Sequence, residues 1–163
     1  MKRYFSLLAV AACTTTIVAV SCSDDSTGPK EQYVVQLTGA KERPNPNGST
    51  ATATATVTVA DANTINFTIT TPGINEVTAG HFHAADETAA GPVIYGFIAN
   101  ATPSATITGT LYTGTILRTS TFNTNAGFNF DSLLTRMRAG TAYLNIHSKT
   151  FPGGEIRGQV KKS

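Results

Sequence analysis

The stretch that decides the fold is residues 50–70, TATATATVTVADANTINFTIT. Alanine and valine alternate with threonine up to Ala60, and apolar residues alternate with polar ones from Ile65 to Ile69. Successive side chains of a β-strand point to opposite faces, so this pattern predicts two strands that each bury one face. The short turn at residues 61–63 joins them as an antiparallel hairpin.

The same period of two continues on both sides of this hairpin. Further strands are expected at residues 33–37, 77–84, 93–99, 105–112, 141–148 and 155–161. The stretch 113–129 is ambiguous, and residues 115–122 are a candidate for one more strand. Together these segments predict an all-β fold, an antiparallel immunoglobulin-like sandwich or barrel of about seven to nine strands.

One short helix is predicted near residues 130–139. Asn129 is a suitable N-terminal cap, and Gly140 is a suitable residue to end the helix. Leu133, Leu134 and Met137 line one side of this helix.

The N-terminal segment predicts export and lipid anchoring. Lys2 and Arg3 precede an apolar stretch, residues 4–20, which is too short and too interrupted by threonine for a membrane-spanning helix. Small residues then lead into Cys22, and the whole segment resembles a bacterial lipoprotein signal, in which this cysteine is acylated. The alternative is ordinary secretion, with no role for the cysteine.

This interpretation divides the chain into a signal peptide at residues 1–21, a flexible tether at 22–31 and one domain at 32–163. Cys13 leaves with the signal and Cys22 carries lipid, so the mature protein has no disulfide. The expected location is the bacterial cell envelope, extracytoplasmic, on the periplasmic side or at the cell surface. The lipid is the expected contact with the membrane.

Charge argues against nucleic acid as a partner. Of the 12 basic side chains, Lys2 and Arg3 lie in the signal, so those that remain balance the 10 acidic ones. No basic stripe runs along the sequence, and nucleic-acid binding is not expected.

The three histidines of the chain are His81, His83 and His147. They alternate with apolar residues in the expected strands 77–84 and 141–148, so they point away from the core. The same alternation places four more polar side chains on the non-core sides of the last two strands: Asn145, Glu155, Arg157 and Gln159. A short glycine-rich connection makes those two strands an antiparallel pair. All seven side chains share one face if the 77–84 strand belongs to the same sheet.

Two interpretations of this polar face stay open. On the structural one, the histidines hydrogen-bond to carbonyls or to Glu155, Arg157 pairs with Glu155 or a loop carbonyl, and no cofactor is expected. On the other, His81, His83 and His147 bind zinc or copper. That metal site would be open to water or closed by Glu155 or Asp86.

A hydrolytic enzyme is not expected. The chain has no Gly-x-Ser-x-Gly motif, and no cysteine remains in the mature protein as a nucleophile. Ser148 lies on the opposite face of its strand from His147, and adjacent acids at residues 86–87 are typical of a solvated turn. We therefore predict that the protein is not an enzyme.

Six motifs follow one another along the chain: Leu37-Thr38-Gly39-Ala40-Lys41-Glu42-Arg43-Pro44, Ala79-Gly80-His81-Phe82-His83, Gly91-Pro92-Val93, Leu133-Leu134 with Gly140, Tyr143-Leu144-Asn145-Ile146-His147 and Gly153-Gly154-Glu155-Ile156-Arg157-Gly158-Gln159. In this order they resemble the CHRD (chordin-type) domain over residues 32–160. This family occurs in animal chordin, an extracellular antagonist that binds growth factors, and in many bacterial secreted proteins and lipoproteins. The resemblance implies an extracytoplasmic β-sandwich-like module with no established catalysis.

From the resemblance and the signal together we expect a lipid-anchored binding or scaffolding module, with an extracellular protein or an envelope ligand as its partner. Growth-factor binding does not carry over to a bacterial lipoprotein. A metal-binding envelope protein is the alternative.

Overall fold

The computed structural model describes residues 31–99 and 106–162. The predicted signal, Cys22 and the tether up to residue 30 lie outside these residues, so lipidation stays a prediction. Glu31, expected to be the last residue of the tether, is instead the first residue of a strand. In the described part of the chain, no helix is long and apolar enough to cross a membrane.

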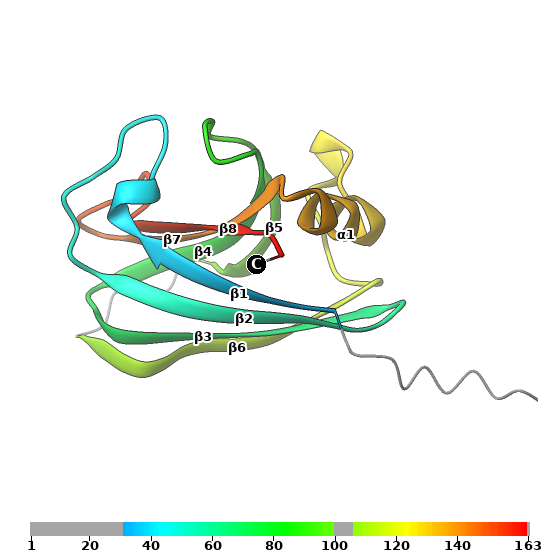
Figure 1. Cartoon of the computed structure of the whole chain (residues 1–163), viewed down its shortest axis with the longest axis horizontal. Coiled ribbons are helices and arrows are strands. Elements are labelled where there is room, and N and C mark those ends of the chain that lie inside the picture. The colour runs from blue at the N-terminus through cyan, green and yellow to red at the C-terminus, as the bar shows by residue number, and fades with distance from the viewer. Residues whose placement is uncertain (1–30, 100–105, 163) are drawn as a thin grey trace, which may run out of the picture.

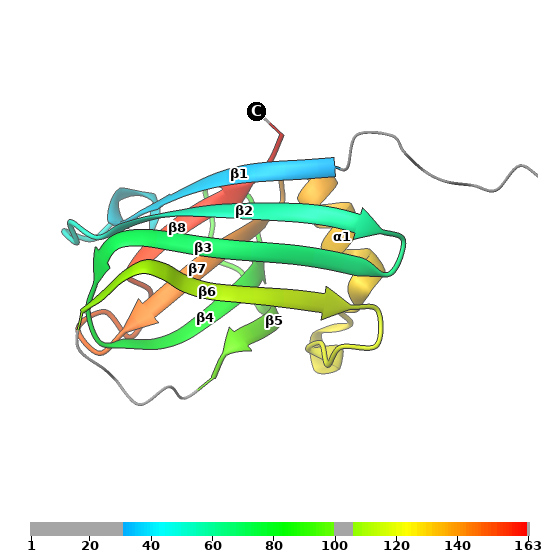
Figure 2. The same cartoon turned by 90° about the horizontal axis from the view of Figure 1, so that it is seen from below.

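Eight strands form one antiparallel sheet that nearly closes into a barrel. They are β1 (Glu31–Thr38), β2 (Thr52–Asp61), β3 (Thr64–Ile74), β4 (Val77–Ala84), β5 (Val93–Ile98), β6 (Ile107–Leu117), β7 (Ala142–Ser148) and β8 (Ile156–Val160). Their order in the sheet is β5-β4-β7-β8-β1-β2-β3-β6. Two layers result, one of β1, β2, β3 and β6, the other of β4, β5, β7 and β8 (Figures 1 and 2). The predicted all-β class is confirmed.

The hairpin predicted from residues 50–70 is β2 and β3. Val57 of β2 lies opposite Phe67 of β3, and both are buried. Ala53 and Ala55 are buried on the same side of β2, whereas Thr54 between them faces outward and is partly exposed. Strict alternation thus places one face of the hairpin in the core and leaves the other to solvent.

Aromatic side chains fill the barrel near its two sheet edges, β5 and β6. The ring centroids of Phe97 on β5 and Tyr112 on β6 are 5.1 Å apart. Phe67 of β3 lies 5.1 Å from Phe97 and 5.3 Å from Phe82 of β4 by the same measure. These rings join the two layers through the core and not through backbone hydrogen bonds.

Helix α1 (Phe130–Ala139) packs at one end of the strands (Figure 2). Asn129 caps it, since its side chain accepts from the Ser132 backbone N–H at 2.9 Å and its own N–H donates to the Ser132 hydroxyl at 2.8 Å. Gly140 ends the helix in the left-handed region, with φ of 68°. Both predicted helix signals are confirmed. Two short 3-10 turns, Gly39–Lys41 and Thr124–Ala126, complete the elements.

The candidate strand at residues 115–122 does not exist as a separate element. β6 continues through these positions to Leu117, because it pairs with β3 along its length and Leu117 lies opposite Thr64. A turn follows, in which the Ser120 N–H donates to the Leu117 carbonyl at 2.9 Å. Ala105, the first residue expected in this strand, lies outside the described residues.

Candidate functional site

The candidate site lies on three adjacent strands, β4, β7 and β8. Strand β7 is antiparallel to both neighbours, so His81 lies opposite Asn145, which in turn lies opposite Arg157. Phe82, on the other side of β4, is fully buried in the core. Alternation therefore places the histidines and the polar residues of the last two strands on one non-core face, as the sequence predicts.

Loops cover this face. They are residues 39–51 between β1 and β2, 85–92 between β4 and β5, and 149–155 between β7 and β8. In Figure 1 the cyan and green connections rise on the same side, beyond β7 and β8. Five polar side chains beneath them expose at most 8% of their surface: His83, Asn145, Glu155, Arg157 and Gln159. The face is thus an internal polar layer.

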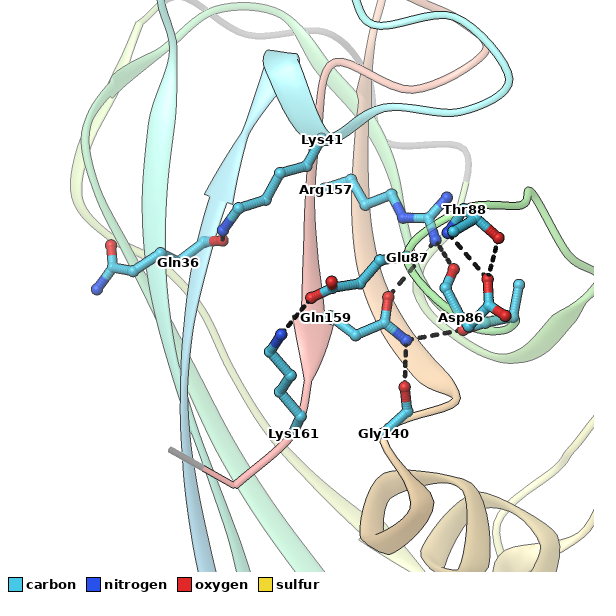
Figure 3. A network of polar contacts seen from close by, with 10 residues as sticks. Gln36, Lys41, Asp86, Glu87, Thr88, Gly140, Arg157, Gln159 and Lys161 are labelled. Atoms are coloured by element: carbon cyan, nitrogen blue, oxygen red, sulfur yellow. Dashed lines mark hydrogen bonds and ion pairs between the residues drawn. The ribbon is translucent and has the colours of Figure 1, made fainter.

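Arg157 connects the sheet to the 85–92 loop (Figure 3). Its guanidinium donates to the Asp86 carbonyl at 2.5 Å and to the Ala89 carbonyl at 2.9 Å. Gln159 donates to the Ala85 carbonyl at 2.7 Å and to the Gly140 carbonyl at 2.9 Å. These partly buried hydrogen bonds hold the 85–92 loop against β8 and give partners to carbonyls that make no bond within the sheet.

Tyr143 lies between the histidines and Arg157. The Arg157 guanidinium carbon is 3.6 Å from the centroid of the Tyr143 ring, and the His83 ring stacks on Tyr143 at 4.8 Å with an angle of 10° between planes. Cation–π and stacking contacts of this kind strengthen when they are desolvated. They link the three strands side chain to side chain.

Glu155 does not pair with Arg157. It accepts a hydrogen bond from the Ser49 hydroxyl at 2.8 Å, and no ion pair joins it to Arg157 among the described residues. Of the two partners expected for Arg157, the loop carbonyl is the one observed. The reason is that Glu155 lies before β8 begins, so strand alternation does not orient its side chain.

The three histidines converge. His81 Nδ1 lies 3.1 Å from His147 Nε2, and one ring nitrogen of each histidine lies within 4.8 Å of those of the other two. Two of the other ring nitrogens bind backbone carbonyls: His83 Nδ1 contacts the Gly91 oxygen and His147 Nδ1 the Pro152 oxygen, both at 2.9 Å. Carbonyls only accept, so each of these Nδ1 atoms carries the proton.

Gly91 positions His83 because only glycine fits there. A Cβ at this position would lie 1.8 Å from the Ala84 carbonyl oxygen. The carbonyl of Gly91 accepts a hydrogen bond from His83, and the N–H of Gly91 donates to the Tyr143 hydroxyl at 3.1 Å. The close approach of the two chain segments therefore orients two side chains of the polar layer.

Burial sets the protonation state of two of the imidazoles. Burial, together with a smaller effect of the neighbouring His147, lowers the pKa of His81 to about 4. Burial also lowers the pKa of His83 to about 4, against the opposing effect of its bond to Gly91. Both rings are therefore neutral at pH 7, the form in which imidazole binds metal ions.

Neither carboxylate expected to close a metal site belongs to this cluster. Glu155 is bound to Ser49, and the Asp86 carboxylate accepts from the Thr88 hydroxyl and N–H at 2.7 and 2.9 Å. Among the described residues, the group able to share an ion consists of the three histidines alone.

Glu42 is a site residue that the sequence did not reveal. It lies in the 39–51 loop, yet it is only 3% exposed, and Asn145 Nδ2 is 3.4 Å from its Oε2. Burial raises the pKa of Glu42 to about 7, while the positive charge of Arg157 acts in the opposite direction. Gly154, at φ of 133°, leaves room for this contact, since a Cβ there would lie 2.7 Å from Glu42 Oε2.

The family model of the CHRD domain matches residues 33–160, which is most of the chain. The chain belongs to the CHRD domain family. No curated protein and no solved structure matches it. The CHRD domain is not a known enzyme family, and membership points to an extracellular binding or scaffolding module.

The motifs behind the resemblance meet in one place in this CHRD domain. Glu42 comes from the first motif, His81 and His83 from the second, and Gly91 from the third. The motif on β7 and the motif that runs from Gly153 into β8 contribute the remaining members of the layer. The most characteristic parts of the sequence therefore build the polar layer and its loops.

Proposed function

We propose that the chain is an extracytoplasmic binding or scaffolding module of the CHRD type, held to a bacterial envelope membrane by a lipid on Cys22. The observation that carries the binding role is the internal polar layer, which holds three loops rigidly over one face of the sheet. Arg157 and Gln159 bind the carbonyls of the 85–92 loop, and Glu155 binds Ser49 of the 39–51 loop. Loops on a rigid scaffold are common binding surfaces.

The hollow between two of these loops suits an acidic group of a partner. A cavity of about 140 Å³ is lined by Lys41, Arg43, Glu87, Arg157 and Gln159. The lining carries three positively charged side chains and one carboxylate, so it favours binding of a negatively charged group. The volume suits a side chain or a small headgroup, which agrees with a protein or an envelope ligand as partner.

The position of β1 supports attachment through the N-terminus. The tether joins the domain at Glu31, and β1 then leads away from α1 toward the 39–51 loop at its other end (Figure 1). The start of the domain and the 39–51 loop therefore lie at opposite ends of β1.

The anchor is tested on the full chain expressed in a bacterium fed a clickable fatty acid. Wild type should incorporate the label and sediment with membranes, whereas Cys22→Ala should lose the label and stay unprocessed or become soluble. Cys13→Ala is the matched control and should behave as wild type. Membrane sedimentation and a mature mass unchanged by Cys22→Ala would contradict the lipid anchor.

The binding role is tested by photocross-linking in cells. A photoreactive residue in place of Asn45, exposed in the 39–51 loop, should give discrete adducts with envelope components. The same residue in place of Thr70, exposed on the outer face of β3, should give none. Equal adducts at both positions, or none at either, would argue against a binding surface on the loops.

A further inference from the structure

The histidine cluster directs three ring nitrogens toward one point. The Nδ1 atoms of His83 and His147 donate to backbone carbonyls, so the Nε2 atom of each carries a lone pair. His81 presents Nδ1 to the Nε2 of His147. A backbone carbonyl that accepts from the other ring nitrogen is the usual outer partner of a metal-binding histidine.

The spacing of these nitrogens is close to that of a metal site. Zn–N bonds of about 2.1 Å in tetrahedral geometry place two ligand nitrogens about 3.4 Å apart. The nitrogens of His81 and His147 are already 3.1 Å apart, and the three nitrogens lie within 4.8 Å of one another. Small side-chain rotations are enough to bring the third nitrogen to the same point.

His83 has an unsatisfied nitrogen in this cluster. Its Nε2 is buried and has no hydrogen-bond partner. An orphaned buried acceptor is costly, and native structures rarely leave one without an ion, a water or another partner.

The geometry points to a mononuclear metal site in which His81 Nδ1, His83 Nε2 and His147 Nε2 bind Cu²⁺ or Zn²⁺. Neutral imidazole ligands suit these two ions among the common biological metals, and the affinity order places copper first. On binding, the His81 proton moves to Nε2, beside Gly96 of β5, which has no side chain to block it. The site is independent of the lipid anchor.

Three protein ligands leave at least one coordination position for water or for a group of a partner. Nearby carboxylates do not fill it, because Glu155 and Asp86 are bound elsewhere. Structural zinc sites are closed by four protein ligands, whereas open sites exchange an outside ligand. The open position therefore assigns the ion a role in ligand contact and not only in stability.

Metal binding is tested on the untagged full chain, extracted from membranes in detergent and stripped with chelator. Titration with CuSO₄ or ZnCl₂ should show one ion per chain and raise the melting temperature. The copper-loaded protein should show nitrogen hyperfine splitting from imidazole in its electron paramagnetic resonance spectrum. This spectrum tests the ligands in wild type, without any variant.

His147→Gln is the decisive variant, because its amide can still donate to the Pro152 carbonyl but offers no imidazole lone pair. Loss of an outer partner costs about 10–100-fold in affinity, so loss of a ligand should cost at least about 100-fold. Thr70→Ala, exposed on the far layer, is the control and should bind as wild type.

Two results would overturn the site. Binding equal in wild type and in His147→Gln would place the ion elsewhere on the chain. No uptake of either metal, with an unchanged melting temperature, would leave the cluster as a hydrogen-bond network only.

Discussion

At the scale of single residues, the polar layer holds the guanidinium of Arg157 by backbone carbonyls and an aromatic ring, and not by an opposite charge. Arg157 is 2% exposed, yet its partners are two loop carbonyls and the face of Tyr143. Buried charges are costly unless they are fully hydrogen-bonded. The 85–92 loop therefore depends on Arg157, and Arg157 depends on the loop.

Arg157→Ala should lower the free energy of unfolding by about 3 kcal/mol, because two loop carbonyls lose their charged donor and the buried Tyr143 ring loses its cation. Urea denaturation measures this, with Lys149→Ala as the control; that lysine is exposed and should cost less than about 0.5 kcal/mol. In a double-mutant cycle, Arg157→Ala and Glu155→Gln should be additive. Strong coupling between them would mean that the two side chains pair in solution.

Glu42 should make the protein less stable as the pH rises through neutrality. Its pKa is raised from 4.5 to about 7, so the folded state holds a proton that the unfolded state releases. This contribution is fully present below about pH 4.5 and is lost as the pH rises to about 7, a difference on the order of 3 kcal/mol. Burial of His81 and His83 acts oppositely, destabilising the fold as the pH falls from 6.5 toward 4.

The variant Glu42→Gln isolates this effect, because the histidine contributions are the same in both proteins and cancel in the difference. The unfolding free energy of wild type minus that of Glu42→Gln should fall between pH 4.5 and pH 7.5. A difference that is flat or rises with pH would show that the carboxyl is ionised in the folded state.

At the scale of elements, α1 is the one helix that supports the barrel end in the described chain. Phe130, Leu133 and Met137 are almost fully buried. The last turn of α1 leads through Gly140 into β7, the central strand of the site. The Gln159 side chain donates a hydrogen bond to the Gly140 carbonyl. The position of the helix thus influences the start of β7.

Asn129→Ala should destabilise the protein by about 1 kcal/mol, because the first turn of α1 loses its capping hydrogen bond. Asn129→Asp keeps an oxygen acceptor and should cost much less. Thermal unfolding of the three proteins at pH 7 compares them directly. An alanine variant as stable as wild type would mean that the cap adds nothing beyond the packing of the helix.

At the scale of the whole molecule, one core holds both layers of the sheet together. Rings from β3, β4, β5 and β6 meet inside it, and α1 covers one end. The outer polar layer adds loops to one side of this core. A single core of this kind predicts cooperative unfolding.

Unfolding of the full chain should be a single transition with a β-type circular dichroism spectrum, and reducing agent should not change its midpoint. The reason is that Cys13 and Cys22, the two cysteines of the chain, both precede the domain. A midpoint that falls on addition of reductant would reveal a disulfide that stabilises the protein.

Local pattern alone determined much of this protein. Alternation in residues 50–70 predicted β2 and β3, and Asn129 and Gly140 predicted the ends of α1. It also predicted which face each histidine occupies. These features follow from backbone geometry within a few residues, which a sequence displays directly.

Only the tertiary structure decided which loops cover the polar face and which groups its side chains bind. Arg157 donates to loop carbonyls, and Glu155 accepts a hydrogen bond from Ser49. Glu42 is buried although it lies in a loop. These contacts join segments far apart in the chain, and the period-two pattern of the strands does not predict the path of a loop. The contact between His81 and His147 needed less from the tertiary structure. Their faces follow from strand alternation, and the contact forms because β7 lies next to β4 in the sheet.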